Sequence, residues 1–344
     1  SGWYWQAPNG IGPVELWAFT VMPAIYAVSG VYLPFNRNGV LAGILAAGIA
    51  VIIWIIWMET SFNNILPPLL APFSIGVWIA LFIAIRNNRK IVLDFSTISA
   101  ARLLRNNKSK SGKTIAITGA GISTASGIPD YTGTGWLDLH VPVRDYSYRK
   151  FCISERCRRL TWKSCAFFKN IVSQAIPNEG HKALADIQRK GYLGEVITQN
   201  VDGFHEAAQT NTVLPIHGII KKTHCLSCDW EGDWPDHDRW MFADITCNDC
   251  GGFIKPSVIA LGEDIPPLIW NKALNAAKDA SLVLAIGSRL SITSAVTLIT
   301  EARRNGAKII FINIGDVNIP VYPNDIAIFL PAEKTLPALL VHLR

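Results

Sequence analysis

The first 85 residues contain two long stretches without a charged side chain. Residues 39–58 and 65–85 supply 20 and 21 such residues, and a helix needs about 20 apolar residues to cross the hydrocarbon core of a bilayer. Residues 14–35 form a third candidate, with Glu15 at its outer end. Helices buried in a soluble core rarely run this long without a polar face. The sequence therefore predicts a membrane anchor over residues 1–90, made of three helices at about 14–35, 39–58 and 65–85.

The charges that follow these stretches predict the orientation of the chain. Residues 86–113 carry eight Lys or Arg residues and one acidic residue, whereas residues 114–344 hold 23 basic and 23 acidic residues. Basic segments beside a membrane span stay in the cytoplasm, so residues 91–113 are expected to be a basic juxtamembrane linker or helix. The prediction is a multi-pass membrane protein with its N-terminus outside and its C-terminal domain on the cytoplasmic side. Homo-oligomerisation through the membrane segment stays open. Nucleic acid is not an expected partner, because the folded domain has no excess of basic residues.

The rest of the chain alternates between strand-like and helix-like stretches. Apolar β-type runs predict strands at 114–118, 195–198, 282–286, 308–313 and 326–330, and helices are expected between them, among others at 180–190 and 267–280. Strands that alternate with helices form a parallel sheet covered on both faces. The expected fold class is α/β, a Rossmann-like doubly wound sheet over residues 95–344, with ligands at the carboxyl ends of the strands.

Four of the seven cysteines fall into two C-x-x-C pairs. Cys225 and Cys228 form the first pair, Cys247 and Cys250 the second, and 18 residues separate the pairs. Four thiolates in this pattern are typical of a closed tetrahedral Zn²⁺ site, which stabilises a fold and leaves no position for a substrate. A small structural zinc module is therefore expected at about residues 219–256. The remaining three are expected to be buried as small apolar side chains, and they are Cys152, Cys157 and Cys165.

The strand expected at 114–118 leads directly into a glycine-rich turn, Gly119-Ala120-Gly121. Such a turn lets backbone N–H groups approach a pyrophosphate, although alone it is weak support for a nucleotide site. The turn continues to Pro129-Asp130-Tyr131, and this run resembles the first NAD motif of the sirtuin family. Further sirtuin-like motifs follow in the family's order from about residue 95 to the end: Pro177-Asn178-Glu-Gly180-His181, Thr198-Gln199-Asn200-Val-Asp202-Gly-Phe-His205, His217-Gly218, the paired cysteines, the run from Gly251 to Glu263, Gly287-Ser288 and Ile312-Asn313.

The resemblance implies an NAD-dependent protein lysine deacylase, with NAD as co-substrate and structural zinc. In that reaction the acyl-lysine oxygen displaces nicotinamide, His217 acts as general base on a ribose hydroxyl, and O-acyl-ADP-ribose is released. An unperturbed imidazole pKa of about 6.5 would suit this role. Asn200 and Asp202 are implied beside His217 at the nicotinamide-ribose end of NAD. The other implied NAD contacts are Gly119, Ala120, Gly121, Ser123, Pro129, Asp130, Tyr131, Gln199, Gly287, Ser288, Arg289, Asn313 and Ile314.

The resemblance also implies where an acyl-lysine protein substrate would bind. Sirtuins pair the substrate backbone with an extended segment as an added strand. The similar segment here consists of Val258, Ile259, Ala260, Leu261, Gly262 and Glu263. His181, at the start of a predicted helix, is expected to be structural and not catalytic. His224 and His237, near the paired cysteines, are not expected to be metal ligands.

Two positions depart from the sirtuin pattern. Thr132 stands where the family's first motif has arginine, and Arg289 lies in the altered Gly-Thr-Ser motif, near the phosphates or ribose. NAD binding is still expected. The departures keep two alternatives open, namely NAD hydrolysis or ADP-ribosyl transfer on the same fold, and a membrane-bound NAD sensor with a weak active site.

The acyl group is expected to be neutral. Sirtuins that prefer acidic acyl groups carry a Tyr-x-x-Arg pair shortly before Pro-Asn-x-Gly-His, where the cation meets the substrate carboxylate. The corresponding stretch, near 165–168, has no cation, and Tyr146 and Arg149 lie too far upstream. An acidic acyl group would then be buried without a partner, so an acetyl or longer acyl group is expected.

Overall fold

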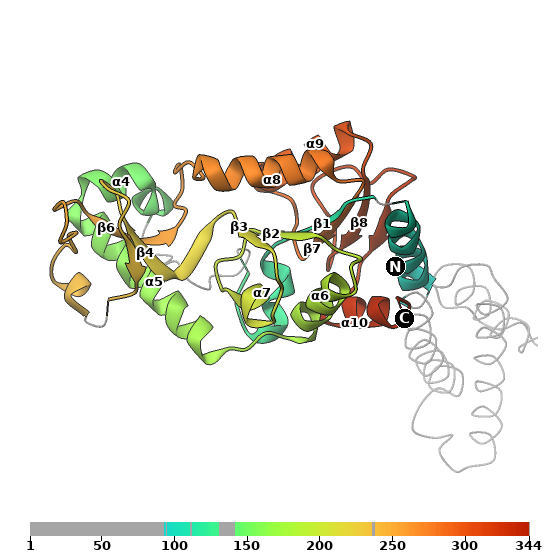
Figure 1. Cartoon of the computed structure of the whole chain (residues 1–344). Coiled ribbons are helices and arrows are strands. Elements are labelled where there is room, and N and C mark those ends of the chain that lie inside the picture. Colours follow the sequence, from blue (N-terminus) through green and yellow to red (C-terminus); the bar gives the residue numbers. More distant parts are fainter. Residues whose placement is uncertain (1–92, 94, 111, 131–141, 236–237, 344) are drawn as a thin grey trace, which may run out of the picture. The chain divides into compact units, whose positions relative to one another are not determined.

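The computed structural model describes residues 93–344 except 94, 111, 131–141, 236–237 and 344 (Figure 1). The chain divides into two units, residues 1–92 and 93–344, and the three predicted membrane spans lie in the first, outside the described residues. Among the residues described, no helix is long and apolar enough to cross a bilayer.

A six-stranded sheet forms the centre of the second unit. Its strand order is β3-β2-β1-β7-β8-β9, and every neighbouring pair is parallel. The chain thus builds β1, β2 and β3 toward one edge and then returns to add β7, β8 and β9 on the other side of β1, so the order reverses between β1 and β7. The strands are β1 Thr114–Thr118, β2 Glu195–Thr198, β3 Val213–Pro215, β7 Leu282–Ile286, β8 Lys308–Ile312 and β9 Ile326–Ile328.

This arrangement confirms the predicted Rossmann-like sheet. The first three predicted strands have the predicted bounds, β8 and β9 end one and two residues earlier, and β3 was not predicted. β3 has only three residues, none of them fully buried, so it carries no apolar run long enough to indicate a strand.

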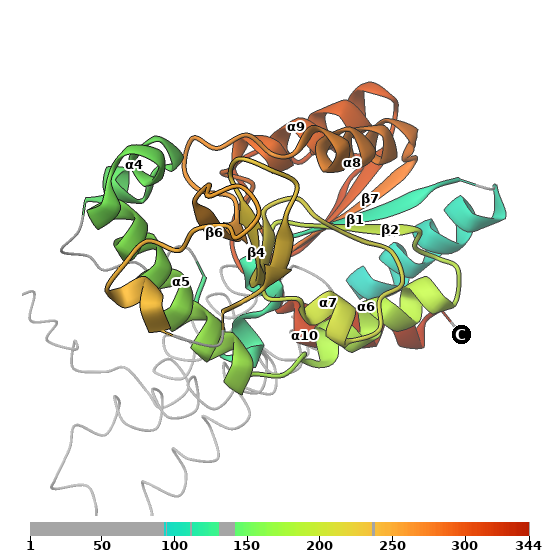
Figure 2. The same ribbon diagram turned by 60° about the vertical axis from the view of Figure 1, so that its left-hand side comes forward.

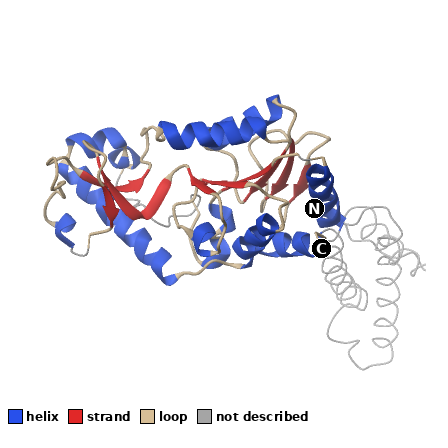
Figure 3. Ribbon diagram, viewed as in Figure 1, coloured by secondary structure: helices blue, strands red, loops and turns tan. Residues whose placement is uncertain are grey.

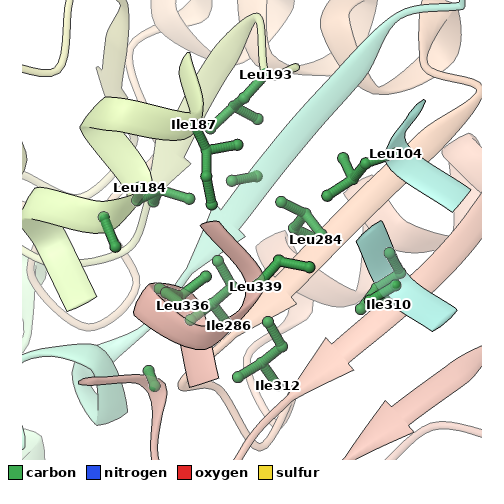
Figure 4. Packing of buried hydrophobic residues seen from close by; sticks show 14 of the residues in the cluster. Leu104, Leu184, Ile187, Leu193, Leu284, Ile286, Ile310, Ile312, Leu336 and Leu339 are labelled. Carbon is green, nitrogen blue, oxygen red and sulfur yellow. The ribbon is translucent and has the colours of Figure 1, made fainter. Parts of the chain in front are cut away.

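Helices cover both faces of the sheet (Figures 1 and 3). One face packs against the helix of residues 95–109, α6 (Glu179–Arg189) and α10 (Ala332–Val341), and the other against α8 (Pro267–Asp279) and α9 (Thr293–Arg304). Leu184 of α6, Leu336 of α10 and Leu284 of β7 belong to the same buried apolar cluster, shown in Figure 4. Alternate residues of each strand point to opposite faces, and both faces are buried. This double burial explains why the strand sequences are almost continuously apolar.

A smaller module within residues 93–344 contains the paired cysteines (Figure 2). It contains an antiparallel sheet of order β5-β4-β6, built from β4 Gly218–Cys225, β5 Glu231–Asp233 and β6 Ile254–Val258, and the helices α4 Tyr148–Ile153 and α5 Glu155–Gln174. The short elements are η2 Ala120–Ile122, η3 Thr124–Ser126, η4 Val143–Tyr146, α7 Phe204–Ala207 and η5 Asp238–Met241.

Helix α5 joins the small sheet through side-chain contacts. Arg158 donates from Nε and Nη2 to the two carboxylate oxygens of Asp244, each at 2.7 Å, and Trp162 packs edge-on against Trp234 with ring centroids 4.9 Å apart. This 20-residue helix was not predicted. Its buried residues recur at helical spacing through Cys157, Thr161, Cys165, Phe168 and Val172, a periodicity that is readable in the sequence although charged residues interrupt it.

Candidate active site

The turns after β1 and β7 meet at the point where the strand order reverses. Gly121 N–H donates to the Gly287 carbonyl at 2.8 Å. A Cβ on Gly121 would lie 2.8 Å from Gly287 Cα, and one on Gly287 would lie 2.3 Å from the Ile122 nitrogen. Gly287 also has a φ of 59°, in the left-handed region that favours glycine. Only residues without a side chain allow this close approach, and doubly wound sheets bind their ligands at this crevice.

A cleft of about 420 Å³ opens above these two turns. Most of the implied NAD contacts line it, and they come from the ends of β1, β2, β7 and β8: Gly119, Ala120, Gly121, Asp130, Gln199, Gly287, Ser288, Arg289, Asn313 and Ile314. Thr124, which lies within the first NAD motif, also lines the cleft, as do Ser291, Ile292 and Ala332, which no motif includes. Arg289 is exposed, and Tyr131 and Thr132 lie outside the described residues.

A smaller pocket adjoins this cleft at Ala120. Pro129, Asn200 and Asp202 line it together with five apolar residues from the loops after η3 and β2 and from α5, β4 and β6, which are Ile128, Val201, Phe168, Ile220 and Val258. Asn200 and Asp202, implied at the nicotinamide-ribose end, therefore face a small apolar pocket, whereas ten of the other implied contacts face the larger cleft.

Asn200 is held in place by two hydrogen bonds to its amide nitrogen. Nδ2 donates to the Gly119 carbonyl at 3.2 Å and to Ser123 Oγ at 3.1 Å. Its buried Oδ1 has no hydrogen-bond partner among the described residues. A buried acceptor without a partner is costly, so this atom is available to a polar ligand in the pocket. Together with the glycine crevice, it makes the site a suitable one for NAD.

Ser123 connects Asn200 to Asp202 and His181. Its hydroxyl, which is fully buried, donates to Asp202 Oδ2 at 2.7 Å, while the other carboxylate oxygen accepts the Phe204 N–H at 2.9 Å. Burial raises the pKa of Asp202, and these hydrogen bonds oppose the rise. Ser123 thus lies beneath the pocket and does not line it.

His181 completes a capping box at the start of α6. Its Nδ1 accepts the Asn178 N–H at 3.3 Å, so the proton lies on Nε2, which is 3.3 Å from Ser123 Oγ. Burial lowers the pKa of His181 to about 4, so the ring is neutral at physiological pH. The structural role expected for this histidine is confirmed.

His217 follows β3 and approaches the end of β2. Its Nδ1 lies 3.1 Å from the Gln199 carbonyl, which can only accept, so Nδ1 carries the proton and Nε2 is the basic nitrogen. Nε2 lies 3.1 Å from Ser294 Oγ of α9, a neighbour that no sequence pattern indicated. Burial lowers the pKa of His217, and the bond to Gln199 only partly offsets this. The pKa of this imidazole therefore lies below the ordinary value of about 6.5.

The four paired cysteines converge on one point. Their sulfur atoms all lie within 4.8 Å of one another, with Cys225 Sγ 3.5 Å from Cys250 Sγ and Cys228 Sγ 3.8 Å from Cys247 Sγ. A tetrahedron with Zn–S bonds of about 2.3 Å has sulfur atoms roughly 3.8 Å apart. Backbone N–H groups of Ser227 and Gly252 also point at cluster sulfurs, as suits thiolates. The cluster thus has the donors and dimensions that a structural zinc ion needs.

The other cysteines and histidines near this module take no part in the cluster. Cys157 and Cys165 are buried as expected, whereas Cys152 is only half-buried. His224 bonds to Ser257 Oγ at 3.0 Å, and His237 lies outside the described residues.

The segment expected to bind substrate continues from β6. Ile259 N–H donates to the His217 carbonyl at 2.9 Å, and the Leu261 carbonyl accepts the Tyr148 N–H at 3.0 Å. Ala260 N–H donates to Glu263 Oε2 at 2.6 Å. Much of this backbone is thus already bonded within the protein, and Glu263, expected at the substrate surface, turns its carboxylate inward.

Comparisons with known proteins agree with this geometry. A profile of the Sir2 family matches residues 119–294. The NAD-dependent protein deacetylase of Thermodesulfovibrio yellowstonii is 36% identical over 209 residues, covering 59% of this chain and 80% of the relative. NAD-dependent protein deacetylase 1 of Pyrobaculum aerophilum is 34% identical over 236 residues, covering 68% and 91%.

Solved structures show the same similarity. A Sir2 homologue in complex with NAD superposes with a TM-score of 0.60 at 28% identity, covering 71% of this chain and 93% of that one. Sir2 bound to an acetylated peptide superposes with a TM-score of 0.58 at 25% identity, covering 67% and 92%. Sheet topology, motif order and these matches together show that this chain belongs to the Sir2 family and is a sirtuin enzyme with NAD as its co-substrate.

Proposed function

We propose that this enzyme removes acyl groups from lysine side chains of proteins and releases nicotinamide and O-acyl-ADP-ribose. The observation that carries the proposal is the state of His217. Its proton is held on Nδ1 by the Gln199 carbonyl, and Gln199 also lines the NAD cleft. The basic Nε2 is therefore fixed in direction by the residue that follows β2, which is the arrangement a general base needs.

The other residues orient the reactants and exclude water. Bound NAD supplies a ribose carbon from which nicotinamide can leave. Asn200 and Asp202, fixed through Ser123, hold polar groups at that end of the site. The apolar wall formed by Phe168, Ile220 and Val258 would surround the acyl-lysine and keep water from competing for the ribose carbon.

Product analysis tests this proposal against its alternative. With NAD and an acetyl-lysine peptide, we expect O-acetyl-ADP-ribose to form in step with free lysine. NAD hydrolysis is the second candidate, because exposed Arg289 lines the cleft where sirtuins have an uncharged residue. Free ADP-ribose formed at the same rate without peptide would favour hydrolysis, and tight NAD binding without turnover would indicate a sensor.

We predict that deacylation stays active below the pH at which an ordinary histidine becomes protonated. Because the pKa of His217 is lowered, its neutral form persists as the pH falls through about 6.5. The acid limb of kcat/KM for the peptide should thus have its midpoint below that value. A profile from about pH 5 to 8 measures it, and a midpoint at or above 6.5 would contradict the assignment.

A second prediction concerns the acyl group. Phe168 stands where a cation would be needed for an acidic acyl group, and burial raises the pKa of the neighbouring Cys165 thiol to about 12, which keeps it neutral. Lys169 Nζ lies 5.3 Å from the Trp234 ring centre, and Arg149 is exposed. We expect kcat/KM for an acetyl-lysine peptide to exceed that for the succinyl-lysine peptide by about tenfold or more. A preference for succinyl-lysine would show that one of these two cations enters the pocket.

We also propose that the enzyme is anchored in a membrane by three helices within residues 1–90, with the catalytic domain on the cytoplasmic side. Two uncharged stretches of 20 and 21 residues, followed by a basic segment, support this. In sealed inside-out vesicles, added protease should digest the catalytic domain. Protection there, together with digestion in right-side-out vesicles, would reverse the topology.

A further inference from the structure

Lys255 is a fully buried cation that no step of the proposed reaction uses. It lies in β6, and its side chain is 1% exposed. An ammonium group inside a protein is strongly unfavourable unless hydrogen bonds and an opposite charge surround it. The groups that surround Lys255 therefore indicate what it does.

Among the described residues, the groups that bond to the Lys255 ammonium all lie in the chain segment that follows it. Its Nζ donates to the Pro256 carbonyl at 3.1 Å and to the Val258 carbonyl at 2.5 Å, and it lies 2.9 Å from Glu263 Oε2. That same oxygen accepts the Ala260 N–H at 2.6 Å, and the Glu263 N–H returns to the Ala260 carbonyl at 3.1 Å. Residues 256–263 thus fold back over one buried ammonium group.

This folded segment is also bonded to the loop that carries the candidate base. Ile259 N–H donates to the His217 carbonyl at 2.9 Å. Residues 258–263 are the expected site of the substrate backbone, and Val258 lines the apolar pocket. One ion pair therefore determines the shape of the surface against which the acyl-lysine chain would lie.

We propose that the Lys255–Glu263 ion pair positions residues 258–263 for binding of the acyl-lysine substrate. The inference rests on the proposed function, because it takes an acyl-lysine protein as the ligand. Most residues that line the NAD cleft follow β1, β2, β7 and β8. In the part of the chain that the structure describes, no cleft residue forms a hydrogen bond or ion pair with the Lys255 or Glu263 side chain. Loss of the pair should thus weaken peptide binding and leave NAD binding intact, a split that general unfolding would not produce.

The test uses the full chain with Lys255→Met and Glu263→Gln combined, because removing both charges avoids leaving one buried without its partner. Fluorescence anisotropy with a labelled acetyl-lysine peptide measures substrate binding without turnover, and calorimetry measures NAD binding. We expect the peptide Kd to rise about tenfold or more, as is usual when a preorganised site is loosened, with the Kd for NAD and the zinc content unchanged.

The control is an exposed Lys–Asp ion pair in the small sheet that also contains Lys255. Lys222 and Asp233 join β4 to β5 at 2.6 Å, with side chains 54% and 83% exposed. Lys222→Met with Asp233→Asn should change neither Kd. If the buried double variant does not fold, Glu263→Asp is used instead. This change shortens the side chain by one methylene, and the peptide Kd is again expected to rise while the Kd for NAD stays unchanged.

Four results would overturn the inference or the proposed function on which it rests. An unchanged peptide Kd in a folded variant would show that the pair does not position the segment, and equal losses of peptide and NAD binding would make its role a general structural one. Peptide binding by the unaltered chain without deacylation would refute the proposed reaction alone. If the unaltered chain bound no acyl-lysine peptide, both proposals would fall.

Discussion

His217→Ala is expected to lower kcat/KM for an acetyl-lysine peptide by about 10²-fold or more, the usual scale for a general base. The basic Nε2 of the imidazole is the proposed proton acceptor, and alanine cannot replace it. NAD affinity should be retained, because His217 does not line the main cleft. Steady-state kinetics with varied peptide, and calorimetry with NAD, measure the two effects.

A second histidine provides the control. His224 in β4 is also half-buried, also contacts a serine hydroxyl, and also has a pKa lowered by burial, but it lines neither pocket. His224→Ala should therefore keep most of the activity. Normal deacylation by the His217 variant would exclude this residue as the base.

Removal of zinc is expected to unfold the small module. The enzyme should contain about one zinc per chain, and Cys247→Ser should lose both the metal and the activity. Phe151, Trp162 and Trp240 pack around Cys225 and Cys247 in one apolar cluster, so loss of the metal would expose large side chains. A structural zinc site of four thiolates can contribute about 10 kcal/mol, which is comparable with the whole stability of a typical domain.

Cys152→Ser is the matched control, because Cys152 is a half-buried thiol of α4 outside the cluster. It should keep the zinc content and the melting temperature of the unaltered enzyme. Metal analysis and thermal unfolding measure both. A folded, active protein without zinc would refute the structural role of the cluster.

Several features could be predicted from the sequence because they depend on neighbouring residues. The spacing within the two C-x-x-C pairs already indicates a four-thiolate site, and the glycines after β1 indicate a close backbone approach. Continuous apolar runs identified β1, β2 and β7 with their observed bounds, because strands buried on both faces have no polar alternation. The Asn178–His181 motif likewise carries its capping box within four residues.

Other features depend on residues that only the folded chain brings together. Gly121 meets Gly287, and His217 lies between the Gln199 carbonyl and Ser294, so neither the basic nitrogen nor the direction of its pKa could be read from spacing. The inward direction of the Glu263 carboxylate could not be predicted from the sequence either, because its partner Lys255 is buried beneath the turn.

The sequence alone was sufficient for five of the six strands of the parallel sheet, the candidate metal ligands and the NAD motifs, since each is encoded by residue types at short separations. Tertiary structure decided which atom of His217 is basic, in which direction its pKa departs from the ordinary value, and which way Glu263 points. The physical reason is that hydrogen-bond partners and desolvation depend on what surrounds a group in space. Those surroundings come from strands and helices that are far apart along the chain.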